Sequence, residues 1–256
     1  MKRGRKVDVG VIVPTRNEAS NVGPLVGRVR SALELAGIEW EILFVDDSDD
    51  DTVPTIQAMA EHDERLRIFH REAGERLGGL AGAVAEGFER SSGPVLAVMD
   101  GDLQHPPEAL PELVSPVLAG RADLVVATRY AAGGSAAGLG GGVRALVSRV
   151  ARALTRLAFP RVRAVSDPLG GFFAVSRGVV DGVDLHPEGF KILLEVLVRG
   201  RWARVAEVPY EFSPRRGGMS KATLKEGMRF VRHVVRLYRT RPRQPEDTSP
   251  DPRGRP

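Results

Sequence analysis

Short apolar runs alternate with amphipathic stretches along the first half of the chain. The apolar runs have the length of buried strands and cover residues 7–13, 41–45, 66–70, 95–99 and 124–128. Between them, apolar residues recur at helical spacing over 17–36, from near Pro54 with Asp51 or Thr52 as N-cap, over 80–90 and over 107–119. Because helices and strands alternate, the pattern predicts an α/β fold with a mainly parallel central sheet and helices on both faces.

The second half of the chain has a looser pattern. It predicts helices over 143–159, 188–199 and 224–239, a loop entering a strand over 167–176, and a strand over 202–212. Two glycine-containing stretches, 131–142 and 214–221, lack periodicity and are expected to be loops. We therefore divide the chain into a basic extension (1–6), an α/β domain (7–223), a basic amphipathic helix (224–239) and a disordered tail (240–256).

Composition narrows the class of protein without naming a function. The 256 residues are 42% hydrophobic, which is enough for one large α/β core. Because the chain has no cysteine, disulfides, thiol catalysis and thiolate metal sites are excluded. The net charge of +4 suits phosphate-bearing ligands or an anionic membrane surface. No apolar run reaches the length of about 18 residues that spanning a membrane requires, and the basic N-terminus does not resemble a secretory signal.

Two carboxylates follow the apolar run 95–99. Asp100 and Asp102 are spaced i, i+2, which would place both on one side of an extended backbone. With Gln104 beside them, they suit Mg²⁺ or Mn²⁺, and Gly101 leaves room for a close approach to the backbone. An acidic surface turn is the alternative interpretation. A second acidic run, 46–51, also follows a strand, which favours a ligand site at the carboxyl edge of the sheet.

Basic residues supply candidates for phosphate binding. Arg129 follows the run 124–128, and Arg215 and Lys221 bracket a Gly-Gly pair that could let this loop close over a substrate. A solvated basic loop is the competing interpretation. The phosphate motifs G-x-G-x-x-G and G-K-[ST] are missing from the stretch 131–142, and the chain has no G-x-S-x-G elbow. Rossmann dehydrogenases, P-loop enzymes and α/β-hydrolases are therefore disfavoured.

The last expected helix carries arginines and lysine on one stripe and apolar side chains on the opposite side. The basic stripe consists of Lys225, Arg229, Arg232, Arg236 and Arg239. The apolar side consists of Leu224, Met228, Val231, Val234, Val235 and Tyr238. Such a helix is typical of an interfacial membrane anchor, but packing of the apolar side on the domain is an equal alternative.

The acidic motifs also belong to a longer pattern. Val13-Pro14-Thr15-Arg16-Asn17-Glu18, Val45-Asp46-Asp47 and Asp100-Gly101-Asp102-Leu103-Gln104-His105-Pro106 resemble the nucleotide-sugar domain of family 2 glycosyltransferases. Within that family the chain is most similar to the polyprenol (dolichol) phosphate mannose synthases, from about Val7 to Leu237. The resemblance implies a GT-A (Rossmann-like) nucleotide-sugar-binding fold, with 7–223 as its catalytic domain.

The resemblance also assigns roles by position. It places the nucleotide at Pro14, Arg16, Glu18, Val45 and Asp47, the metal and diphosphate at Asp100, Gly101, Asp102 and Gln104, and phosphate contacts at Arg129, Arg215 and Lys221. Of these, Asp102, Arg129, Arg215 and Lys221 are the expected catalytic residues. The segments 166–173 and 189–195 match the acceptor-side loop and the helix after it. Two positions depart from the family: Arg16 replaces a frequent aromatic residue, and Asp47-Ser48-Asp49-Asp50 replaces Asp-Asp-Gly-Ser.

The implied reaction is inverting transfer of mannose from GDP-mannose to a polyprenyl (dolichyl) monophosphate, with Mg²⁺ or Mn²⁺. The resemblance further implies a peripheral position on the cytoplasmic face of a membrane, no nucleic-acid partner, and room for a separate membrane-protein partner. UDP-glucose or another nucleotide sugar is an alternative donor. A sugar-nucleotide pyrophosphorylase is an alternative of another class, although its glycine-rich loop is replaced here by Pro14–Glu18. A non-catalytic binding relative is opposed by the complete set Asp100, Asp102, Arg215 and Lys221.

Overall fold

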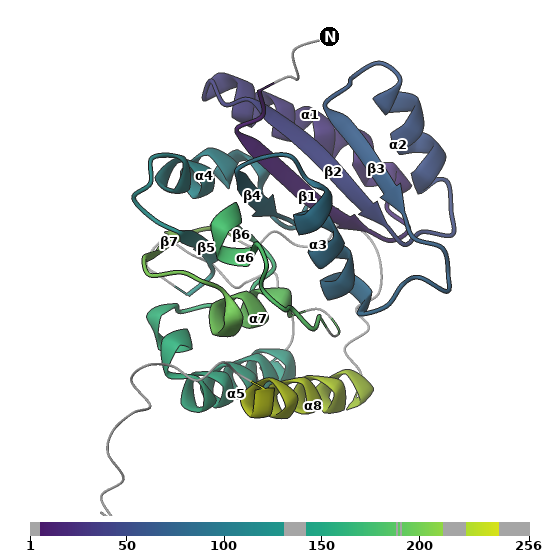
Figure 1. The fold of residues 1–256 in the computed structure, drawn as a ribbon. Coiled ribbons are helices and arrows are strands. Elements are labelled where there is room, and N and C mark those ends of the chain that lie inside the picture. The colour runs from purple at the N-terminus through teal and green to yellow at the C-terminus, as the bar shows by residue number, and fades with distance from the viewer. Residues whose placement is uncertain (1–5, 131–141, 188, 190, 212–223, 241–256) are drawn as a thin grey trace, which may run out of the picture.

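A seven-stranded sheet forms the centre of the molecule (Figure 1). The computed structural model describes residues 6–130, 142–187, 189, 191–211 and 224–240, with backbone alone for 142–148 and 224–229. The strands are β1 (Val9–Thr15), β2 (Trp40–Asp46), β3 (Leu66–His70), β4 (Val95–Val98), β5 (Leu124–Thr128), β6 (Phe173–Ser176) and β7 (Val205–Pro209). Their order across the sheet is β3-β2-β1-β4-β6-β5-β7.

Most strand pairs are parallel. β1 pairs in parallel with β2 and β4, β2 with β3, and β5 with β7. β6 runs antiparallel to both of its neighbours, β4 and β5. All seven residues of β1 and of β2 are buried, as expected for central strands with both faces covered. The α/β fold with a mainly parallel sheet is thereby confirmed.

Helices cover both faces of the sheet. They are α1 (Ala19–Leu35), α2 (Thr52–Ala60), α3 (Gly79–Arg90), α4 (Leu110–Leu118), α5 (Gly142–Ala158), α6 (Arg177–Val180), α7 (Ile192–Arg199) and α8 (Leu224–Thr240), with short 3₁₀ turns η1 (Pro107–Ala109) and η3 (Pro160–Ala164). Apolar residues of α1, α2 and α4 pack in the core on one face. Those of α3 and α7 form the core on the other.

Helices α5 and α8 lie next to each other at the end of the molecule away from α1 and α2 (Figure 1). Leu237 of α8 belongs to the same core cluster as α7, and Ala151 of α5 packs against that cluster. The ring of Phe159, just after α5, lies 6.2 Å from the ring of Tyr238. Among the described residues, no helix combines the length and the apolar character needed to cross a membrane.

Several element boundaries differ from the sequence expectation. Helix α7 begins at Ile192 rather than at residue 188, and β7 is shorter than 202–212. At the start of α2, Asp51 occupies the N-cap position, but its side chain makes no cap bond. The carboxylate of Asp50 instead accepts the N–H of Thr52 at 3.0 Å. The loops expected at 131–142 and 214–221 and the expected tail at 240–256 fall mainly or wholly outside the described residues.

Candidate active site

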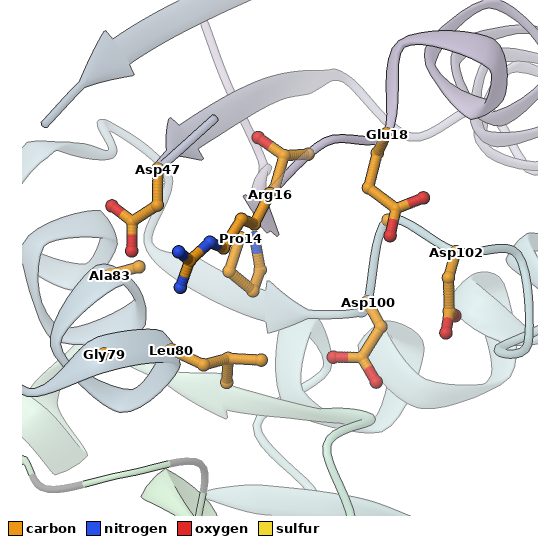
Figure 2. Close-up of a pocket in the computed structure, with 11 residues that line it drawn as sticks. Pro14, Arg16, Glu18, Asp47, Gly79, Leu80, Ala83, Asp100 and Asp102 are labelled. Atoms are coloured by element: carbon orange, nitrogen blue, oxygen red, sulfur yellow. The ribbon is translucent and has the colours of Figure 1, made fainter. Parts of the chain in front are cut away.

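A pocket opens at the carboxyl ends of β1, β2 and β4 (Figure 2). It is lined by Pro14, Thr15, Arg16, Glu18, Asp47, Gly79, Leu80, Ala83, Asp100, Gly101 and Asp102. Strand β1 lies between β2 and β4, so the crossovers leave it in opposite directions and a crevice remains at its end. Such a switch point is where open α/β sheets bind their ligands.

The pocket brings together most of the residues that the sequence singled out. Pro14, Arg16, Glu18, Asp47, Asp100, Gly101 and Asp102 all line it. Val45 lies instead in the core, and Gln104 and Arg129 are largely buried outside the pocket lining. Arg215 and Lys221 lie outside the described residues. Sequence reasoning did not select Thr15, Gly79, Leu80 or Ala83, although the Gly78-Gly79 pair before a helix was an available signal.

Asp100 and Asp102 reach the pocket from a turn. The expected extended backbone at these positions is wrong, because β4 already ends at Val98. The turn includes Leu103 with a φ of 60°, an uncommon conformation for a residue with a side chain. Inside it, the Gln104 N–H donates to Asp102 Oδ1 at 3.1 Å. Local hydrogen bonding and the left-handed Leu103, rather than strand alternation, therefore orient the two carboxylates. Figure 2 shows both of them at the pocket.

His105 holds the turn that carries Asp100 and Asp102 in place. Its Nδ1 accepts the backbone N–H of Asp100 at 3.0 Å, and its Nε2 lies 3.7 Å from Asp100 Oδ2. The ring stacks on Phe172, with centroids 5.1 Å apart, and meets Tyr210 edge-on. Burial lowers the pKa of His105 to about 4, so the imidazole is neutral at physiological pH. The buried His105 thus orients the acidic turn.

Glycines let the acidic turn pack closely on its surroundings. A Cβ on Gly101 would lie 3.1 Å from Cγ2 of Thr15, at the end of β1. A Cβ on Gly171 would lie 3.4 Å from Asp100 Oδ1 and 3.4 Å from Cε1 of His105. The close approach that the sequence predicted at Gly101 is therefore made by β1.

The donor set of the acidic turn fits a hard divalent cation that shares its ligands with a substrate. Asp102 is 8% exposed, whereas the Asp100 side chain is 34% exposed toward the pocket. Among the described residues, no group of three or more His, Cys, Asp or Glu side chains could hold a metal alone. Mg²⁺ and Mn²⁺ commonly bind through one or two carboxylates and complete their shell with phosphate oxygens and water. The role of Gln104 as a third ligand stays a prediction.

The opposite end of the pocket is built on Asp46, which is fully buried. Its Oδ1 accepts the hydroxyl groups of Thr15 at 2.7 Å and Ser48 at 2.6 Å. Its Oδ2 lies 2.8 Å from Nδ1 of His70. Ser48 Oγ also accepts the N–H of Asn17, a residue with a φ of 62°. Ser48 thus ties the ends of β1 and β2 together.

Asp47 is held by a buried arginine. Arg71 Nε and Nη2 donate to the two carboxylate oxygens of Asp47 at 2.8 and 2.6 Å. Nη2 also donates to the carbonyl oxygen of Gly79 at 2.9 Å, and Nη1 to that of Leu77 at 3.2 Å. Because Arg71 is 2% exposed, this contact fixes both the orientation of Asp47 and the position of the pocket-lining start of α3.

A second bidentate pair lies on the acceptor-side loop identified from the sequence. Arg129 Nε and Nη2 donate to Asp167 at 2.7 and 3.1 Å, with both side chains nearly buried. Burial opposes the charge of Arg129, but Asp167 more than compensates, and the pKa of Arg129 stays above its usual value. Lys191 Nζ donates to the carbonyl of Leu169 at 2.7 Å, and burial lowers the pKa of Lys191 to about 8. Two cations therefore lie under this loop.

Comparison with known proteins identifies the family. The model of "Glycosyl transferase family 2" matches residues 10–182. A dolichol-phosphate mannosyltransferase of Pyrococcus furiosus is 40% identical over 90% of this chain and 64% of the relative. Those of Mycosarcoma maydis and Saccharomyces cerevisiae are 38% and 35% identical, over 79% and 87% of their own lengths and 90% and 91% of this chain. The chain thus spans less than two thirds of the Pyrococcus relative.

Solved structures share the fold. Mannosyl-3-phosphoglycerate synthase from Rubrobacter xylanophilus superposes with a TM-score of 0.70 at 22% identity, over 94% of this chain and 78% of that one. Glucosyl-3-phosphoglycerate synthase from Mycobacterium tuberculosis, in complex with Mn²⁺, UDP-glucose and phosphoglyceric acid, gives a TM-score of 0.62 at 25% identity, over 91% of this chain and 79% of that one. With this fold, the match over residues 10–182 and relatives at 35–40% identity, the chain belongs to glycosyl transferase family 2.

Proposed function

We propose that the chain transfers mannose from GDP-mannose to a polyprenyl (dolichyl) monophosphate with inversion at the anomeric carbon. The observation that carries the proposal is the pocket itself, in which Asp47 follows β2 and the pair Asp100 and Asp102 follows β4, on either side of β1. Support for mannose and the lipid comes from the three dolichol-phosphate mannosyltransferases that the chain resembles along most of its length. The pyrophosphorylase alternative is set aside by the family match.

Asp100 and Asp102, with Gln104 beside them, would hold Mg²⁺ or Mn²⁺. When bound, such an ion supplies charge neutralisation for the diphosphate leaving group. The Mn²⁺ and UDP-glucose bound by the Mycobacterium tuberculosis enzyme support this assignment. The neutral His105 keeps Asp100 oriented, and Gly101 lets the turn approach β1, so the carboxylates are positioned before the donor arrives.

The acceptor half needs positive charge more than a strong base. A lipid monophosphate is already anionic at neutral pH, so its oxygen can attack without giving up a proton. Lys191 places positive charge beneath the acceptor-side loop, beside the Arg129–Asp167 pair, where it favours the approach of an anion. Arg215 and Lys221 remain sequence predictions for donor and acceptor phosphate contacts, in a part of the chain that is not described.

The position of the acceptor in a membrane requires a surface that can meet lipid. Helices α5 and α8 expose the apolar side chains Val150, Leu154, Leu157, Val231, Val235 and Tyr238. The apolar side of α8 is thus divided, because Leu237 packs inward while these three α8 residues face outward. The basic stripe is divided too, since Arg232 is exposed whereas Arg236 donates to the carbonyl of His186. We infer that the protein lies peripherally on the cytoplasmic face of a membrane, with these exposed side chains of α5 and α8 against lipid. A membrane-protein partner that covers the same side chains is the alternative.

One experiment distinguishes GDP-mannose from UDP-glucose as the donor. Purified protein is incubated with Mn²⁺, a polyprenyl phosphate and either GDP-mannose or UDP-glucose, and the lipid product is identified by mass spectrometry. The proposal expects a mannosyl phospholipid from GDP-mannose, and no product after an excess of EDTA. A glucosyl lipid formed only from UDP-glucose would establish the same-class alternative instead. Release of GDP without any lipid product would contradict the assigned acceptor.

A further inference from the structure

The guanidinium of Arg16 lies in the pocket without a hydrogen bond or ion pair to any residue that the structure describes. Its two arginine neighbours behave differently. Arg71 forms a bidentate ion pair with Asp47, and Arg76 forms one with Asp49 at 2.7 and 3.0 Å. Arg16 is exposed, and no contact within the described fold accounts for its position. A guanidinium directed into a pocket in this way is available to a ligand.

Arg16 is placed at the end of the pocket away from the acidic turn. Figure 2 shows its guanidinium on the side of Asp47, over the start of α3, whereas Asp100 and Asp102 stand on the other side. Electrostatics agrees with this placement. The pKa of Asp49 is lowered mainly by its hydrogen bond with Arg76, and the charge of Arg16 adds to that effect. A diphosphate held at the acidic turn would therefore leave Arg16 near the nucleoside.

Asp47 is the hydrogen-bond acceptor beside Arg16. Arg71 approaches each of its two carboxylate oxygens once, and each oxygen has a further lone pair. Because both the side chain of Asp47 and the start of α3 are fixed by Arg71, the acceptor cannot rotate away when a ligand binds. This end of the pocket thus presents a fixed acceptor next to an adaptable forked donor.

That combination matches one nucleobase better than the others. Guanine carries two adjacent acceptors, O6 and N7, which an arginine fork takes together, and its N1–H and N2 amino group donate on the neighbouring edge. Adenine places an amino donor beside N7, and uracil has no acceptor pair of this kind. We propose that Arg16 is the specificity-determining residue for the nucleobase, taking O6 and N7 of guanine while Asp47 accepts from N1 and N2. This inference rests on the proposed function and assigns the donor to the guanosine diphosphate class.

Binding of nucleoside diphosphates tests the inference without any transfer step. Isothermal titration calorimetry in Mn²⁺ compares GDP, UDP and 7-deaza-GDP, which lacks the N7 acceptor, on wild type, Arg16→Ala and Arg16→Lys. Arg121→Ala, which removes an exposed arginine outside the pocket lining, is the matched charge control. Circular dichroism and thermal unfolding confirm that each variant is folded.

We expect wild type to bind GDP at least about 10-fold more tightly than UDP or 7-deaza-GDP, the scale of one bidentate base contact. Arg16→Ala should bind GDP and 7-deaza-GDP equally. Arg16→Lys should not restore the difference, because an ammonium group lacks the fork. Arg121→Ala should match wild type.

The outcomes separate the two proposals. Tighter binding of UDP than of GDP by wild type would overturn the guanosine donor and, with it, this role for Arg16. Preference for GDP that persists in Arg16→Ala would overturn the role of Arg16 alone and leave the proposed reaction intact. Equal weakening of GDP and UDP in Arg16→Ala, with full rescue by Arg16→Lys, would reassign Arg16 to the phosphates.

Discussion

At the residue scale, the carboxylates around the pocket divide into those that hold the fold and those directed at a ligand. Asp46 is fully buried and accepts hydrogen bonds from Thr15 and Ser48, so its charge is satisfied within the protein. Asp100 is partly exposed and, with Asp102, faces the pocket. Neutralising a carboxylate should therefore affect stability at Asp46 and activity at the acidic turn.

Asp102→Asn and Asp46→Asn should have contrasting effects. Asp102→Asn should lower kcat by at least about 100-fold, the scale of losing a transition-state electrostatic contact, while the unfolding temperature stays near that of wild type. Asp46→Asn should destabilise the fold by about 1–3 kcal/mol, because buried donors lose their charged acceptor. Transfer assays and urea unfolding of both variants measure this contrast. Full activity of wild type in excess EDTA would contradict the metal role of Asp102.

The neutral His105 should make stability depend on pH. Its folded-state pKa of about 4 lies below the ordinary value of 6.5, so protonation favours the unfolded chain. The unfolding free energy begins to fall as pH drops below about 6.5 and falls until about pH 4. The total loss reaches roughly 3 kcal/mol, at about 1.4 kcal/mol per pH unit. His105→Asn keeps an acceptor for the Asp100 N–H but does not titrate. Between pH 7 and 4 this variant should lose less unfolding free energy than wild type; equal losses would contradict the burial argument.

At the element scale, the strands and helices that follow from local patterning were predictable. Mostly apolar runs identified β1 and β2, and the bounds of β3 and β5 agree with the expected ranges. The antiparallel β6 between β4 and β5 could not be derived, because an apolar run does not specify its partner strand. Asp100 and Asp102 were found from their motif, but their turn was missed since it depends on His105 and on Leu103 in a left-handed conformation.

Contacts between elements that are far apart along the chain could not be predicted from the sequence either. The partner of Arg71 is Asp47, which directly follows β2, and the same guanidinium reaches the start of α3. Nothing in the local pattern around Arg71 indicates either contact. The start of α3 enters the pocket through this arginine, which explains why Gly79 and Leu80 were missed as lining residues.

Removing the Arg71–Asp47 ion pair should lower the free energy of unfolding. Arg71→Ala leaves Asp47 as an uncompensated, largely buried charge and should lower the unfolding free energy by about 3–5 kcal/mol. Arg76→Ala is the matched control, because its partner Asp49 is largely exposed, and it should cost no more than about 1 kcal/mol. Guanidinium chloride unfolding compares the two. Similar losses in both variants would mean that burial does not govern the Arg71 pair.

At the scale of the whole molecule, the outer helices are linked to the pocket by one connected segment. Arg236 of α8 donates to the carbonyl of His186, and the His186 N–H donates to the buried Glu195 of α7 at 2.6 Å. Further along the segment, the carbonyl of Gly189 accepts the N–H of Ala81, in the first turn of α3. The surface proposed to meet lipid and a wall of the pocket are thus held by the same segment, so we expect a change in α8 that disturbs Arg236 to affect the pocket as well.

A test of membrane contact should therefore leave Arg236 in place and change only outward side chains. We expect Val231→Ser with Val235→Ser to weaken binding to anionic liposomes, because both valines are about half exposed and their apolar burial in lipid would be lost. Arg232→Glu with Arg239→Glu should weaken it further in low salt, since each basic residue contributes about 1 kcal/mol near an anionic surface.

Leu35→Ser is the control, because Leu35 is 93% exposed on α1, at the other end of the molecule. Liposome co-sedimentation measures binding, and GDP titration verifies that the pocket is unchanged. Transfer to a short, water-soluble polyprenyl phosphate should survive the valine changes better than transfer to a long one, because only the long acceptor requires the enzyme at the bilayer. If the valine variant sediments as fully as wild type and as Leu35→Ser, α8 does not contact lipid, and the exposed residues of α5 become the surface to test.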